Sequence, residues 1–290
     1  MTAQTETSRS RLFDAKALAR HRARARLDKA GFVHDEARVE LQERLLDVNR
    51  SFTSPAIVTP FPAHWTDFLP GAVVVPDAES LALDDGAHDL VLHVMGLHWA
   101  EDPVGQLVQC RRALGPDGLL IVVLLGGETL HELRAVLAQA EAEVMGGLSP
   151  RIAPMGEIRD LGGLLGRAGL SLPVADRLPQ RVTYETMFHL IRDLRDMGET
   201  NALAARHRVT PPRAFFPRAA RIYAESYPSE ANRIAATFEL VFLTGWSPHE
   251  SQQKPLRPGS AAARLAEALD TTEFDETARP VPAPDKRGQE

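Results

Sequence analysis

The sequence lacks several features that would identify a class of protein at once. Its 290 residues include a single cysteine, Cys110, which excludes an internal disulfide framework and a multi-cysteine zinc site. No apolar run reaches the roughly 18 residues of a transmembrane helix, and no apolar signal-peptide core follows the N-terminus. A formal net charge of −6 gives no reason to expect nucleic acid as a partner. We therefore expect a protein of a reducing, intracellular compartment.

Strand-like and helix-like segments alternate along the chain. Short apolar runs predict buried strands at 56–59, 73–75, 89–94 and 119–125, and a late strand at 238–246. Helical spacing predicts helices over 36–50, 104–114, 130–145, 157–168, 187–197 and 214–226. This alternation favours a doubly wound, mostly parallel α/β sheet, whose ligand site lies outside the carboxyl ends of the strands.

Two of these predictions carry further detail. The helix over 36–50 is expected to bury one apolar stripe, made of Val39, Leu41, Leu45, Leu46 and Val48. The segment Pro-Asp-Gly at 116–118 predicts a turn before the strand at 119–125, since proline presets φ and glycine accepts a positive φ.

Glycine is missing from the stretch where it matters most. Residues 54–65 read SPAIVTPFPAHW, with three prolines and no glycine. Backbone N–H groups hold a phosphate or carboxylate at close range, an approach that glycine permits, whereas proline has no N–H. The fold therefore predicts a nucleotide-binding enzyme, but this stretch does not predict its cofactor loop.

Positive charge gathers near the N-terminus. Between Arg9 and Lys29 there are eight Lys or Arg residues and two acids, Asp14 and Asp28. Such a segment fits a solvated helical arm, a contact for an anionic membrane surface or acidic partner, or an organellar transit peptide. Only four of the 33 basic residues are lysine, and this arginine bias, with abundant alanine, points to a GC-rich bacterial genome.

A family resemblance rests on several motifs in a fixed order. The run LVLHVMGLHW…RRALGPDGLLIVVLLGG, from 90 to 127, resembles the second half of a class I S-adenosylmethionine methyltransferase domain. Within that superfamily the chain resembles the mitochondrial complex I assembly factors, described as arginine hydroxylases, and more distantly the malonyl carrier-protein methyltransferases. The narrower resemblance rests on RLFDAKALARHRARA (11–25), GGETLHELR (126–134), SPRIAP (149–154), DLGGLLGRAG (160–169), MGETNAL (197–203) and GWSPHESQQKP (245–255). It implies that the basic arm is part of the mature protein.

The resemblance implies a set of cofactor-binding residues, and this sequence matches only some of them. Asp77 and Ala78 match the acid beside the adenine and its neighbour, and Leu97, His98 and Trp99 match a loop lining the adenine and substrate side. The glycine-rich acidic loop is replaced by AIVTPFPAHW, and the helix and strand that carry the ribose-binding acid are missing. The missing ribose-binding acid removes a charge-assisted hydrogen bond to the cofactor, which contributes about 1.5–3 kcal/mol to binding. We therefore expect an eroded pocket and no bound cofactor, with S-adenosylmethionine the cofactor if the pocket still functions.

Polar residues elsewhere offer a second candidate site. Thr129 and Glu132 fit either an anion-binding turn or a capping box, in which Thr129 is the N-cap. His249 and Glu250 follow the last strand, where a loop position favours a site over a packing role. The histidines show no two-histidine-one-carboxylate pattern, so no metal is expected. No catalytic residue is predicted.

We expect three regions: a basic arm or helix at 1–35, a methyltransferase-like domain at 36–257, trimmed in its first half and with helical insertions before the last strand, and a largely disordered tail at 258–290 with a short helix over 261–269. The leading functional hypothesis is assistance in respiratory complex I biogenesis, with a complex I subunit or assembly intermediate as partner. An active methyltransferase or protein-modifying enzyme and a non-catalytic binding module remain alternatives. The expected location is a bacterial cytoplasm, with peripheral contact to the inner membrane left open.

Overall fold

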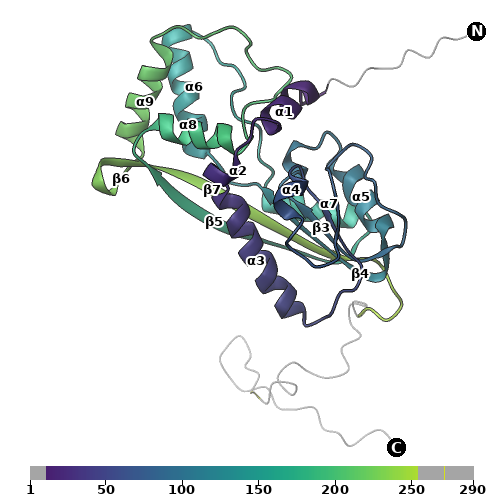
Figure 1. The fold of residues 1–290 in the computed structure, drawn as a ribbon. Coiled ribbons are helices and arrows are strands. Elements are labelled where there is room, and N and C mark those ends of the chain that lie inside the picture. The colour runs from purple at the N-terminus through teal and green to yellow at the C-terminus, as the bar shows by residue number, and fades with distance from the viewer. Residues whose placement is uncertain (1–10, 254–270, 272–290) are drawn as a thin grey trace, which may run out of the picture. The chain divides into compact units, whose positions relative to one another are not determined.

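The computed structural model describes residues 11–253 and residue 271 (Figure 1). The chain divides into two units, Met1–His249 and Glu250–Glu290, and every helix and strand assigned in the described residues belongs to the first. The helix predicted over 261–269 lies outside the described residues, as does the predicted tail at 258–290 apart from Thr271. Within the described part of the chain, no helix is both long and apolar enough to cross a bilayer.

The elements alternate as the sequence predicts. The helices are α1 Ala15–Arg22, α2 Leu27–Ala30, α3 Phe32–Val48, α4 Pro62–Trp65, α5 Pro103–Ala113, α6 His131–Met145, α7 Ile158–Arg167, α8 Met187–Asp196 and α9 Phe215–Ser226, with 3₁₀ turns η1 Leu97–Trp99 and η2 Glu230–Asn232. The strands are β1 Pro55–Val58, β2 Val73–Val75, β3 His88–Val94, β4 Leu114–Leu125, β5 Ser171–Tyr184, β6 Pro228–Ser229 and β7 Arg233–Trp246.

One seven-stranded sheet organises these elements. Its order is β2-β1-β3-β4-β7-β5, with β6 also pairing with β7. Strands β2, β1, β3 and β4 are parallel, whereas β7 is antiparallel to its three partners β4, β5 and β6. One strand thus runs against the others, and the expected mostly parallel α/β fold is confirmed.

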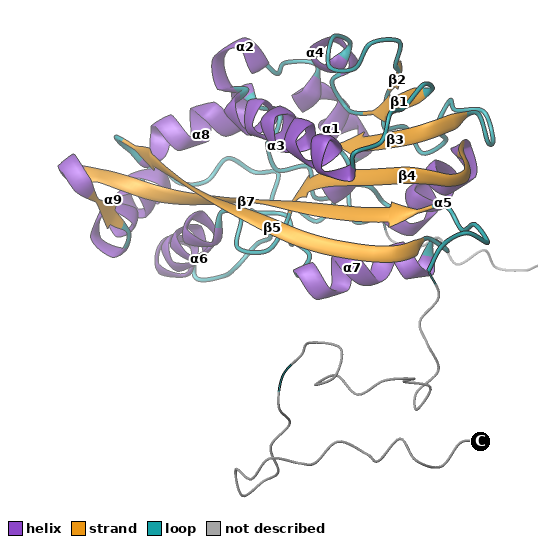
Figure 2. Cartoon of the chain, turned by 90° about the horizontal axis from the view of Figure 1, so that it is seen from below, coloured by secondary structure: helices purple, strands orange, loops and turns teal. Residues whose placement is uncertain are grey.

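Helices cover both faces of the sheet (Figure 2). Alternate residues of β4 enter opposite cores, because successive side chains of a strand point to opposite faces. Leu119, Ile121, Val123 and Leu125 pack in the core that includes residues of α3, α6, α8 and α9. Leu120, Val122 and Leu124 pack in the core that includes residues of α5 and α7. This two-sided burial explains why LLIVVLL carries no polar residue.

The first half of the sheet is short. Strand β2 pairs directly with β1, through Ala56–Val73, Ile57–Val74 and Val58–Val75. Only α4 lies between these two strands in the chain. No further helix–strand unit separates them, as the spacing of the sequence predicts.

Three details differ from the predictions. Strand β5 was not predicted, because its alternating exposure and its prolines at 173 and 179 conceal a strand at the sheet edge. The segment 116–118 forms an irregularity inside β4 rather than a turn before it, with Asp117 at a φ of 58°. Helix α3 buries Val33, His34, Ala37 and Leu41, while Val39 and Leu46 are exposed, so the predicted stripe was wrong at those two positions.

Two of the leucines of α3 give a matched pair for testing the core. Leu41 is 0% exposed and Leu46 is 77% exposed. Leu41→Ala removes packed atoms and leaves a cavity, so we expect it to lower the free energy of unfolding by about 2–5 kcal/mol. Leu46→Ala should change that energy by no more than about 0.5 kcal/mol. Urea denaturation followed by circular dichroism measures both, and equal effects would contradict the packing described.

Candidate functional site

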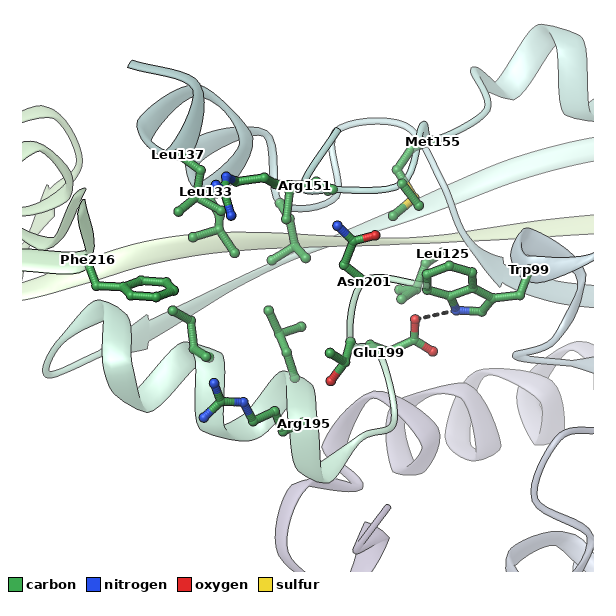
Figure 3. Close-up of a pocket in the computed structure, with 16 residues that line it drawn as sticks. Trp99, Leu125, Leu133, Leu137, Arg151, Met155, Arg195, Glu199, Asn201 and Phe216 are labelled. Atoms are coloured by element: carbon green, nitrogen blue, oxygen red, sulfur yellow. Dashed lines mark hydrogen bonds between the residues drawn. The ribbon is translucent and has the colours of Figure 1, made fainter. Parts of the chain in front are cut away.

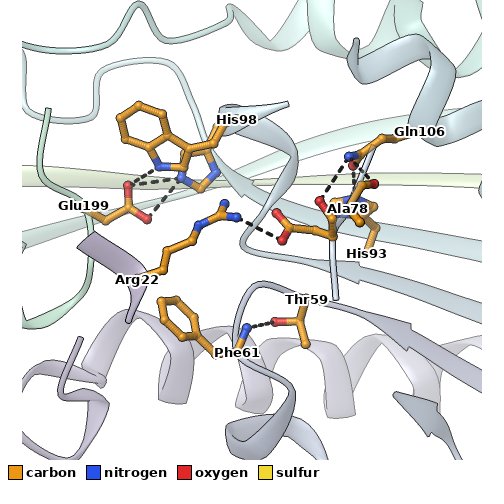
Figure 4. Close-up of polar contacts among 10 residues, drawn as sticks. Arg22, Thr59, Phe61, Ala78, His93, His98, Gln106 and Glu199 are labelled. Carbon is orange, nitrogen blue, oxygen red and sulfur yellow. Dashed lines mark hydrogen bonds and ion pairs between the residues drawn. The ribbon is translucent and has the colours of Figure 1, made fainter. Parts of the chain in front are cut away.

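The parallel strands bring several loops to one edge of the sheet. Asp77 and Ala78 follow β2, and η1 follows β3. Because the carboxyl ends of parallel strands share an edge, the loops that carry Asp77, Ala78 and Leu97–Trp99 meet there (Figure 4). Leu97 is 2% exposed and packs in the hydrophobic core beneath the loop, so its side chain holds the loop in place.

Asp77 is bound by a cation from the N-terminal segment. Nη1 of Arg22, the last residue of α1, donates to Oδ1 of Asp77 at 2.9 Å, and the two side chains are 18% and 9% exposed. A Cβ at Gly96 would lie 2.5 Å from Oδ2 of Asp77, so only glycine fits opposite the carboxylate. The acid that the resemblance places beside the adenine is therefore enclosed by groups of the chain itself.

The carbonyl of Ala78 is also engaged. Gln106 of α5 donates from Nε2 to the Ala78 oxygen at 3.2 Å, and its Oε1 lies 2.7 Å from Nε2 of His93. Both His93 and Gln106 are buried. These bonds fix the loop after β2 to α5 and β3 (Figure 4).

The proline-bearing segment after β1 has no free backbone donor at its start. Pro60 and Pro62 have no N–H. The N–H of Thr59 donates to the carbonyl of Val75 at 3.0 Å, and the N–H of Phe61 donates to Oγ1 of Thr59 at 3.3 Å. No N–H of residues 59–62 is therefore left to hold a ligand, and the segment is a structural connection rather than a cradle.

A buried histidine anchors the same segment. Trp65, at the end of α4, donates from Nε1 to Nδ1 of His34 at 3.2 Å. His34 is 3% exposed and its ring also packs edge-on against Phe61. Burial lowers the pKa of His34 from 6.5 to about 3. The ring is therefore neutral at physiological pH, as an acceptor for the Trp65 N–H must be.

A buried carboxylate, that of Glu199, joins the polar side chains at the strand ends, and with Arg22 and Asp77 they form one polar cluster (Figure 4). Both oxygens of Glu199, which follows α8, lie 3.3 Å from Nε2 of His98, and Nε1 of Trp99 donates to Oε2 at 2.7 Å. Burial acts to raise the pKa of Glu199, but the charge of His98 and the hydrogen bonds from His98 and Trp99 outweigh it and lower the pKa. Glu199 is therefore ionised at neutral pH.

Two members of this cluster were not predicted from the sequence. Glu199 belongs to the motif MGETNAL, and Arg22 belongs to the basic arm, which was interpreted by its charge alone. The order of the family motifs could have pointed to Glu199. Nothing in the sequence pairs Arg22 with Asp77, which lies 55 residues further along the chain.

Trp99 lies between two cavities. On one side, Arg22, Asp77, Ala78 and Trp99 help to line a cavity of about 210 Å³. On the other, Trp99 and Glu199 help to line a mostly apolar cavity of about 200 Å³ at the end of β4 (Figure 3). Its remaining walls come from α6, α8, α9 and the loop at 151–155. Phe13 packs edge-on against the Trp99 ring at 5.1 Å and closes the cluster from the N-terminal side.

The predicted capping box at Thr129 and Glu132 was wrong. Leu130, not Thr129, precedes α6, and no side chain caps the helix. Oγ1 of Thr129 donates to the carbonyl of Gly126 at 2.7 Å and accepts from the N–H of Glu239 at 2.9 Å. The carboxylate of Glu132 accepts from the N–H and Oγ1 of Thr237. Both side chains bind the turn to β7.

The alternative interpretation of that turn is an anion site, but four of the N–H groups that such a site would use already have acceptors. The N–H groups of Gly126, Gly127, Thr129 and Leu130 all donate to carbonyls of the chain. His249 lies beyond the other end of β7, and the nine residues from Thr237 to the end of that strand at Trp246 span roughly 30 Å at strand spacing. Thr129 and Glu132 are therefore not brought together with His249, and Glu250 begins the second unit.

The described residues contain no group of three His, Cys, Asp or Glu side chains placed to hold a metal ion. Cys110 is buried, and burial raises the pKa of its thiol to about 12. It is therefore an inert core residue rather than a nucleophile.

Comparison with known proteins identifies the domain. Residues 14–122 match the model of a methyltransferase domain family. The YcgJ protein of Bacillus subtilis has a TM-score of 0.44 and 9% identity, over 69% of this chain and 94% of that structure. Residues 14–122 therefore resemble a methyltransferase domain.

Two kinds of named protein are similar to most of this chain. The chain is 40% identical over 202 residues to the zebrafish (Danio rerio) "Arginine-hydroxylase NDUFAF5, mitochondrial", an alignment that covers 70% of this chain and 63% of the relative. It is also 33% identical over 186 residues to a malonyl-[acyl-carrier protein] O-methyltransferase of Xylella fastidiosa, covering 64% of this chain and 60% of that protein. The chain is thus a homologue of the NDUFAF5 proteins and spans less than two thirds of their length, and the family resemblance read from the ordered motifs is confirmed.

The expected bacterial, cytoplasmic location is contradicted. The NDUFAF5 relatives, at 38–40% identity, are mitochondrial proteins. The expectation rested on an arginine and alanine bias, which reflects nucleotide composition and does not report the compartment of a protein.

The His34–Trp65 bond predicts a pH dependence of stability. The folded chain keeps His34 neutral down to about pH 3, whereas the unfolded chain protonates it near its ordinary value of 6.5. This contribution is therefore complete above pH 6.5 and is lost as the pH falls from 6.5 towards 3. Between pH 7.5 and pH 5, we expect the wild type to lose about 2 kcal/mol more stability than His34→Asn, which keeps an acceptor but does not titrate. Urea denaturation at the two pH values measures this, and equal losses would show that His34 is not held neutral.

Proposed function

We propose that this chain assists the biogenesis of respiratory complex I and that its cofactor cleft no longer binds S-adenosylmethionine. The observation that carries the first part is the ordered similarity to the NDUFAF5 proteins over about 70% of the chain. The partner is then a complex I subunit or assembly intermediate. The apolar cavity beside Trp99 and Glu199 is the part of the site best suited to receive a segment of that partner, because it is concave and mostly apolar.

The second part rests on residues that do not fit the cofactor. Residues 59–62 offer no free N–H, and Arg22 occupies the carboxylate of Asp77. Arg22 also places positive charge beside the cleft, which disfavours a sulfonium cation. A hydrogen bond to a charged group contributes about 1.5–3 kcal/mol, so losing several such contacts weakens binding by powers of ten.

Methyl transfer is a second candidate function. Asp77 and Ala78 keep the positions that the resemblance assigns to the adenine side, and the Xylella relative is an O-methyltransferase. The two functions differ in whether S-adenosylmethionine binds, so a direct binding measurement separates them.

Isothermal titration of the full chain with S-adenosylmethionine should give no saturable heat at micromolar concentrations. Arg22→Ala should behave in the same way, because it frees Asp77 but restores no N–H donor to residues 59–62. Saturable micromolar binding by the wild type would favour the methyltransferase. Binding by Arg22→Ala alone would mean that the arginine blocks an otherwise competent cleft.

A strain that lacks this chain should assemble less complex I, seen on native gels and as reduced NADH oxidation by its membranes. Expression of the wild type should restore assembly. Asp77→Asn, which keeps the shape of the side chain and removes its charge, should restore it equally well, since no cofactor depends on that carboxylate. Normal complex I in the deletion strain would contradict the proposed role, and failure of Asp77→Asn alone, with the variant folded by circular dichroism, would favour an enzyme.

A further inference from the structure

A groove next to the apolar cavity is lined, among the described residues, by cations and by no acid. It has a volume of about 770 Å³ and is lined by Arg11, Leu12, Arg134, Pro150, Ile152, Pro154, Leu203, Ala204 and Ala205. We call these nine residues the acid-free groove. Two arginines stand among seven apolar or small residues, and Leu12 is 48% exposed.

Segments far apart in the chain form this groove. Phe13 and Leu203 make an antiparallel bridge, and the N–H of Ala204 donates to the carbonyl of Leu12 at 2.9 Å. On the other side, Nη2 of Arg134 in α6 donates to the carbonyl of Ala153 at 3.3 Å. Hydrogen bonds within the chain therefore hold both walls, so the groove exists before any ligand arrives.

The charges of the groove are poorly neutralised. Arg134 donates to a carbonyl, not to a carboxylate. Arg11 lies 3.5 Å from Glu79, with both side chains more than 60% exposed, and such a surface pair contributes little. Nearby, Arg206 and Arg208 share the one carboxylate of Asp14. Glu101 accepts from the N–H groups of Leu12 and Phe13. Four arginines therefore stand near three acids, so the field at the groove is positive and favours an anionic partner.

The acid-free groove is continuous with the candidate site. Ile152 lines both the groove and the apolar cavity beside Trp99. A polypeptide lying in the groove would therefore have neighbouring side chains within reach of that cavity. Extended segments bind in this manner, with alternate side chains in pockets and charged ones at the rim.

We propose that the acid-free groove binds an extended polypeptide segment in which apolar and acidic side chains alternate. The apolar side chains lie on Leu12, Ile152 and Leu203, and the acidic ones face Arg11 and Arg134. This inference rests on the proposed function, because it names the chemistry of the partner segment that the assembly role requires.

Fluorescence anisotropy of the full chain tests it with two labelled ten-residue probes, one alternating Leu and Glu and the other alternating Leu and Lys. We expect the Leu–Glu probe to bind about tenfold more tightly than the Leu–Lys probe, and more weakly as salt is added. Arg11→Gln with Arg134→Gln should weaken the Leu–Glu probe about tenfold, or about 1.4 kcal/mol, because both cations that face its acidic side chains are removed. Glutamine at 134 keeps a donor for the Ala153 carbonyl.

Lys29→Gln, an exposed cation on α2 outside the groove, is the matched control and should bind the Leu–Glu probe as the wild type does. Arg11→Gln alone, at an exposed position, serves if the double variant fails to fold by circular dichroism, and it should weaken the probe about threefold. Equal binding of the two probes, or wild-type binding by the groove variants, would overturn the proposal. The proposal would also be overturned if the chain bound phosphatidylglycerol vesicles through the groove but did not bind the Leu–Glu probe.

The outcome is separable from that of the proposed function. If the Leu–Glu probe fails while the chain still restores complex I in the deletion strain, the groove proposal alone is wrong. If the probe binds but the deletion strain has normal complex I, the groove is real and the assembly role is wrong.

Discussion

The ion pair between Arg22 and Asp77 is the contact on which the interpretation of this site depends. Asp77 stands at the carboxyl end of β2, where an open nucleotide cleft would leave a carboxylate available. In this chain Arg22 binds the carboxylate at 2.9 Å, and both side chains are largely buried. Breaking the pair would leave a partly buried charge unsatisfied, which costs more than the pair itself contributes. The N-terminal helix is therefore part of the site rather than an arm beside it.

The fold and the cofactor-binding loops can vary independently because different residues form them. The alternating residues of β4 build both cores, and none of them belongs to the loops at the strand ends. The connection between β1 and β2 can therefore be short and rich in proline while the sheet keeps its order and its two covered faces. A fold hosts a site and does not specify its chemistry.

The sequence predicts the fold better than it predicts the site. Long apolar runs such as 119–125 identify central strands because two-sided burial leaves no room for polar residues. Strand β5 escapes this rule, since one of its edges is unpaired and its side chains alternate in exposure. The motifs place Asp77 and Trp99 at the strand ends, but Arg22 and Glu199 reach them across 55 and 100 residues of chain. Such contacts depend on tertiary packing, which no local pattern records.

The central claim is that an inherited methyltransferase scaffold now serves complex I assembly. The most direct measurement is affinity purification of the tagged chain at its native level, followed by identification of the proteins that co-elute. The account predicts a complex I subunit among them, and loss of that subunit when the cavity beside Trp99 is filled by Leu133→Trp. Purification without any complex I subunit, from cells that are assembling the complex, would contradict it.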